Sequence, residues 1–105
     1  MKFEFKPVRK KIDLGEYAEE MSGAAIQVQV NVSRETLGRM TAVSNDMPQE
    51  DFLVLLAELW GADWPLEDVK ALYEHCREND PQLWIWITGR TWELVLTYQA
   101  GQKKR

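Results

Sequence analysis

The chain has 105 residues, of which 45% are hydrophobic and 29% charged, so it can form one globular domain with a modest core. The net charge is −4, and residues 34–99 carry 5 basic against 12 acidic side chains, a net of −7. This acidic body excludes broad nucleic-acid binding, which requires a basic face that replaces counterions. A single cysteine, no N-terminal signal region and no apolar run of ~18 residues predict a cytoplasmic chain without a membrane segment.

Extended structure is predicted in the first third of the chain. Phe3 and Phe5 alternate with charged residues, which predicts a short strand that ends at Pro7. A looser extended pattern covers 8–14, and a connection follows up to Gly23. The clearest strand is 25–32, whose apolar residues alternate with polar ones: Ile26, Val28, Val30 and Val32 face one way. We expect an antiparallel pair or meander with one solvated face.

Three helices are predicted to follow. Ser33 is a typical N-cap for a helix over 34–43. Asn45, Asp46 and Pro48 open a second helix that ends at Gly61. Its core-facing residues have helical spacing: Phe52, Leu55, Leu56, Leu59 and Trp60. The third helix starts at Pro65. Acidic residues in its first turn stabilise the helix, because they interact favourably with the positive end of the helix dipole.

The segment 82–99 is compatible with two structures. As a helix it has one apolar stripe, formed by Leu83, Trp84, Ile87, Thr91, Leu94, Val95 and Tyr98. As a β-hairpin that turns at Gly89-Arg90 it pairs Ile87 with Trp92 and Ile85 with Leu94. The helix is preferred because Asp80-Pro81 repeats the start signal of the two preceding helices.

No residue pattern predicts catalysis, so we expect no enzyme activity, no catalytic residues, no cofactor and no metal. His75 and Cys76 are sequence neighbours, and neighbours on a helix point about 100° apart. A second histidine or cysteine that could complete a metal site is missing. The paired carboxylates Glu50-Asp51 and Glu67-Asp68 are explained by their places in first helical turns.

Five tryptophans, all in the second half, exceed what a core of this size normally contains. Trp is enriched at the energetic centres of protein interfaces. Trp60 closes the core stripe of the second helix. We therefore predict partner binding by Trp64, Trp84, Trp86 and Trp92. Trp86 is the first choice because it falls on the polar face of the predicted helix, and a second copy of the chain is a further expected partner.

The layout resembles that of small phage tail assembly chaperones. The similarity lies in residues 12–17, in 26–31 with Arg34-Glu35, and in the inter-helix segment from Trp60 to Leu66. The family has no catalytic residues, and the resemblance implies binding of a tape measure or tail tube protein during virion assembly, in the host cytoplasm. The alternative is an acidic interaction or inhibitor module of the nucleic-acid-mimic type, from a phage or a bacterium.

The expected fold class is α+β. Short N-terminal antiparallel strands pack on a bundle of three to four helices in one domain, residues 1–102. Residues 103–105 form a basic tail.

Overall fold

The computed structural model describes residues 6–43 and 47–103, which form two strands, two short 3-10 turns and four helices. In chain order the elements are β1 (Arg9–Asp13), η1 (Leu14–Glu16), η2 (Glu19–Met21), β2 (Ala25–Gln29), α1 (Arg34–Thr41), α2 (Gln49–Trp60), α3 (Leu66–Asn79) and α4 (Pro81–Lys103). The α+β class is confirmed. Several predicted features lie outside the described residues: the strand around Phe3 and Phe5, the helix-opening pair Asn45 and Asp46, and the tail residues Lys104 and Arg105.

The two strands form an antiparallel sheet in which Lys10 lies opposite Val28 and Ile12 opposite Ile26. Ile12, Ile26, Val28 and Val30 are fully buried. Their neighbours in sequence are largely exposed, as the alternating pattern predicts for a sheet with one covered face. The second strand ends at Gln29, earlier than predicted, although the Val30 N–H still donates to the Val8 carbonyl.

Short-range signals set the helix ends. The Ser33 hydroxyl accepts the Thr36 N–H at 3.1 Å and caps α1. Gly61 ends α2 with φ of +83°, a conformation that side-chain-bearing residues rarely adopt. Pro65 precedes α3, and the Asp80 carboxylate accepts the Leu83 N–H at the start of α4.

Residues 82–99 lie within one helix, α4, so the preferred prediction is confirmed and the hairpin alternative is wrong. One stripe of α4 faces the core and is buried at Leu83, Ile87, Thr91 and Val95. The opposite stripe is exposed at Gln82, Gly89, Glu93 and Thr97. The helix is favoured at 82–99 because α4 contacts both α3 and the sheet, and these contacts cover its apolar stripe.

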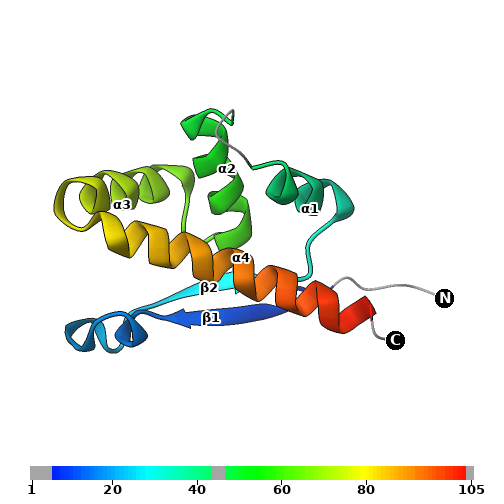
Figure 1. The fold of residues 1–105 in the computed structure, drawn as a ribbon, viewed down its shortest axis with the longest axis horizontal. Helices are drawn as coiled ribbons and strands as arrows, with labels where there is room; N and C mark the ends of the chain where they lie inside the picture. The colour runs from blue at the N-terminus through cyan, green and yellow to red at the C-terminus, as the bar shows by residue number, and fades with distance from the viewer. Residues whose placement is uncertain (1–5, 44–46, 104–105) are drawn as a thin grey trace.

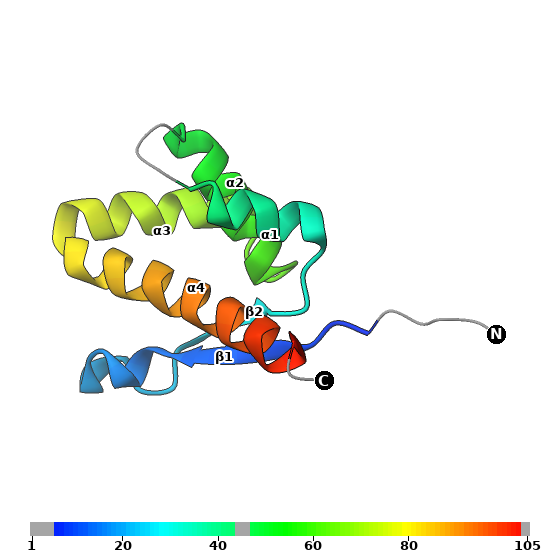
Figure 2. The same ribbon diagram turned by 45° about the vertical axis from the view of Figure 1, so that its right-hand side comes forward.

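The helix α4 lies between the sheet and α3, and α2 contacts both α3 and β2 (Figures 1 and 2). The predicted stripe of α2 is buried at Leu55, Leu56, Leu59 and Trp60, whereas Phe52 is only half-buried. In the core, the Trp60 indole N–H donates to the Thr91 hydroxyl at 3.1 Å, which in turn donates to the Ile87 carbonyl at 2.9 Å. A buried polar pair therefore joins α2 to α4.

Candidate functional site

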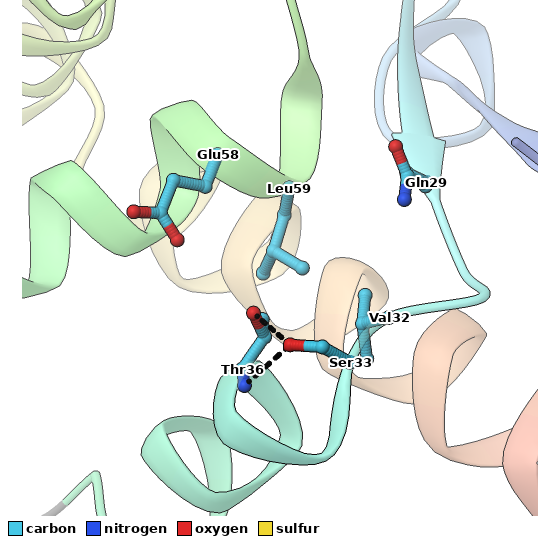
Figure 3. Close-up of a pocket in the computed structure, with 6 residues that line it drawn as sticks. All are labelled: Gln29, Val32, Ser33, Thr36, Glu58 and Leu59. Atoms are coloured by element: carbon cyan, nitrogen blue, oxygen red, sulfur yellow. Dashed lines mark hydrogen bonds between the residues drawn. The ribbon is translucent and has the colours of Figure 1, made fainter.

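A hollow of about 260 Å³ lies where β2, α1 and α2 meet, and it contains mostly polar side chains (Figure 3). The Ser33 hydroxyl points into it, and its hydrogen bonds go to the backbone and side chain of Thr36. Glu58, on the α2 side, pairs with Arg39. These groups stabilise a helix start and a helix–helix contact, and they supply no nucleophile with an adjacent base.

His75 is exposed and Cys76 is fully buried, which shows that the two side chains point in different directions. Burial, and then the charge of Asp80, raise the pKa of the Cys76 thiol. A raised pKa works against the thiolate that nucleophilic or metal-binding cysteines require. Within residues 6–43 and 47–103, no three His, Cys, Asp or Glu side chains gather in a way that could hold a metal ion.

The acidic side chains of α2 and α3 are interrupted by cations. A hollow of about 510 Å³ between these helices holds Lys70, which pairs with Glu50 at 2.9 Å. It also holds Arg77, which pairs with Glu74 at 3.2 Å. Alternating charge of this kind is typical of a solvated helix surface and differs from a continuous phosphate-like row.

The four tryptophans predicted to bind a partner are all half-buried, and the structure separates them into three groups. Trp64 and Trp84 both pack edge-on against Trp60, with ring centroids 5.4 and 6.4 Å away. Trp86 instead contacts Tyr17 of the turn after η1, at 5.5 Å. Trp92 stacks on Phe52 at 5.5 Å with 21° between the ring planes. They therefore do not form a single surface.

The Trp92 ring lines a shallow, mainly apolar groove of about 360 Å³ between α2 and α4, which we call the α2–α4 groove. It is lined by Val43, Phe52, Ile85, Thr88, Gly89 and Trp92. Ile85 is 60% exposed. Full burial of an aliphatic side chain of this size stabilises a protein by about 1.5–3 kcal/mol, and most of that stabilisation is not realised at Ile85. The groove thus presents apolar surface to solvent.

The polar side-chain atoms of Trp92 and Thr88, which line the α2–α4 groove, are bonded within the protein. The Trp92 indole N–H donates to the Met40 carbonyl at 3.2 Å. The Thr88 hydroxyl lies 3.0 Å from the Trp84 carbonyl and 3.1 Å from the Ile85 carbonyl. These bonds fix the ring and the groove floor, and they leave apolar contact as the main interaction that the groove can offer.

Trp92 is predicted from the sequence to bind a partner, but the other residues that line this groove are not. Ile85, Gly89, Trp92 and Leu96 recur at intervals of four, three and four residues, which defines a second apolar or small stripe on α4. Leu96 is 42% exposed and is the other large hydrophobic residue at the surface of the described chain. That spacing is the signal that could have located the groove. When a helix has two apolar stripes and packs one of them on the core, the second stays at the surface.

Comparison of the chain with protein-family models, with curated proteins and with solved structures finds no match. None of the helices within residues 6–43 and 47–103 has the length and apolar character needed to cross a membrane.

Proposed function

We propose that this protein is a non-enzymatic binding domain whose α2–α4 groove receives an apolar side chain from a helical segment of a partner protein. The observation that carries the proposal is the exposed Ile85 beside the rigid Phe52–Trp92 stack. Apolar patches of this kind, with an aromatic at the centre, are typical of protein-binding surfaces. A groove lined by two helices suits a third helix, because helices pack with their ridges in such grooves.

The proposed partner is a phage tail protein, either the tape measure or the tail tube subunit. The support comes from the resemblance of residues 12–17, 26–31 and 60–66 to small tail assembly chaperones. An aggregation-prone tape measure protein exposes apolar surface before assembly, and covering such surface is what the groove chemistry allows. Binding would take place in the cytoplasm of the host cell.

The four tryptophans have different parts in this proposal. Trp92 is the predicted interface residue that lines the groove. For Trp64, Trp84 and Trp86, partner binding stays a prediction. Each packs on another aromatic ring of the same chain, so Trp→Ala at any of them would change stability together with binding.

The test is the affinity of the Ile85→Asp variant for purified tape measure or tail tube protein. A carboxylate in an apolar groove loses its hydration when the partner binds, so we expect affinity to fall by at least about tenfold. Thr97→Asp is the matched control, since it adds the same charge to an exposed position of the same helix. Both variants should unfold at the temperature of the parent protein.

Unchanged affinity of Ile85→Asp for both tail proteins would refute the proposal. The other possible occupant of the groove is a second copy of the chain. Sedimentation of the parent protein over a concentration series tests for this self-association. Self-association that is lost in Ile85→Asp, with no binding of tail proteins, would assign the groove to a homo-oligomer instead.

A further inference from the structure

Within the described residues, the strand β1 forms an open edge of the sheet. Its one strand partner is β2, and no other described element lies along its outer side in either ribbon view (Figures 1 and 2). An open edge has a row of backbone N–H and C=O groups that can pair with a further strand. None of the residues that line the α2–α4 groove belongs to β1.

The hydrogen-bond pattern identifies the groups that point outward. The Val30 N–H donates to the Val8 carbonyl and the Leu14 N–H to the Ala24 carbonyl, so residues 8 and 14 lie in hydrogen-bonded pairs. Such pairs alternate with non-bonded ones along an antiparallel ladder. Arg9 and Lys11, opposite Gln29 and Gln27, are therefore in non-bonded pairs, and their backbone groups point away from β2.

Three exposed cations, Arg9, Lys10 and Lys11, follow one another along this edge. Among the described residues none of them forms an ion pair. The nearest carboxylate in the strand, Asp13, accepts the Gly15 N–H at 2.9 Å and caps η1. Within the described residues, these three cations are therefore not neutralised by a paired carboxylate.

We propose that the outer edge of β1 binds an extended acidic segment of a partner protein as a third strand. Main-chain hydrogen bonds to Arg9 and Lys11 would provide affinity, as in other complexes in which a peptide adds to a sheet. Arg9 and Lys11 share one face of the sheet, so glutamate or aspartate side chains opposite these two cations would provide selectivity through cross-strand ion pairs. The same cations repel a second copy of β1, so pairing of two identical edges is disfavoured.

The probe is a blocked eight-residue peptide of alternating Glu and Val, and the measurement is amide hydrogen exchange of the full chain. We expect protection of the outward amides of Arg9 and Lys11, whereas the amides of Lys10 and Ile12 are already bonded in the ladder. The matching Lys/Val peptide should not bind. Binding of the acidic peptide without protection at Arg9 and Lys11 would overturn the proposal.

Charge reversal separates strand addition from general attraction. Lys11→Glu should weaken binding of the acidic peptide by about tenfold, because it replaces a cross-strand attraction by a repulsion. Arg34→Glu changes the net charge equally at an exposed position of α1, and it should leave the affinity unchanged. Equal weakening by both variants, or equally tight binding of a single-stranded oligonucleotide, would show a non-specific charge effect and refute the proposal.

This surface is independent of the α2–α4 groove. Ile85→Asp should bind the acidic peptide like the parent protein, since Ile85 lies on a different element. The proposal for the α2–α4 groove and the proposal for the edge of β1 can therefore be refuted independently.

Discussion

The Tyr17 hydroxyl lies 3.0 Å from both carboxylate oxygens of Asp80, a residue 63 positions later in the chain. Asp80 also accepts the Leu83 N–H at 3.2 Å, so one carboxylate caps α4 and holds the turn after η1 against the α3–α4 junction. The Tyr17 ring contacts Trp86 in the same place. This long-range contact explains why a tryptophan expected on the polar face of α4 is half-buried.

Tyr17→Phe should lower the melting temperature by a few degrees, because it removes the hydroxyl donor and leaves the ring contact with Trp86. Thermal unfolding followed by circular dichroism measures the effect. Tyr98→Phe is the control, since within the described residues the Tyr98 hydroxyl makes no hydrogen bond and its loss should change little. An equal melting temperature for the parent protein and Tyr17→Phe would show that the bond contributes nothing to stability.

The stability of the protein should fall in alkali above the usual tyrosine pKa of about 10. Partial burial, and then the hydrogen bond to Asp80, raise the pKa of the Tyr17 hydroxyl in the folded state. The unfolded chain therefore loses this proton at lower pH, so the stabilisation is complete below the unfolded pKa and is lost as pH rises through the folded pKa. Denaturant unfolding at pH 8 to 11 should show a smaller decrease for Tyr17→Phe than for the parent protein.

Thr91→Val should destabilise the protein by about 1–3 kcal/mol, because it leaves the buried Trp60 indole N–H without its acceptor. The change conserves side-chain shape, so the loss reports the hydrogen bond. Urea unfolding gives the free energy. The same replacement at the exposed Thr97 is the control and should change stability by less than about 0.5 kcal/mol.

Gly89→Ala should stabilise the fold and weaken partner binding. A Cβ atom at Gly89 meets nothing within 4 Å, so the substitution removes the helix penalty of glycine, about 0.5–1 kcal/mol, without a clash. The added methyl narrows the α2–α4 groove, so the proposed tail-protein partner should bind less tightly. Gly38→Ala in α1 is the matched control, because its Cβ is equally free of contacts and Gly38 does not line the groove. A gain in stability with unchanged binding would argue against the groove as the interface.

Leu56→Ala should cost about 2–5 kcal/mol of unfolding free energy, because Leu56 is fully buried in the middle of α2. Chemical denaturation measures this loss. A cost below about 0.5 kcal/mol would mean that the site faces solvent in solution. Phe52→Ala should be milder, since Phe52 is half-buried at the rim of the groove.

The sequence by itself determined the elements whose cause is local. Ser33 caps α1, Gly61 ends α2 and the i, i+3, i+4 spacing of leucines marks the buried face of α2. Alternation at Ile26, Val28 and Val30 identifies the covered face of the sheet. These signals are readable because backbone conformation and burial periodicity depend on near neighbours in the chain.

Only the tertiary structure decided which apolar side chains remain at the surface. Trp86 and Ile85 are adjacent in sequence, yet Trp86 is covered by Tyr17 and Ile85 is open to solvent in the α2–α4 groove. At 82–99 the local signal Asp80-Pro81 already favours the helix, and the contacts of α4 with α3 and the sheet show what covers its apolar stripe. Periodicity gives the face on which a side chain lies, but burial depends on which distant segment packs on that face, and that information is spread over the whole chain.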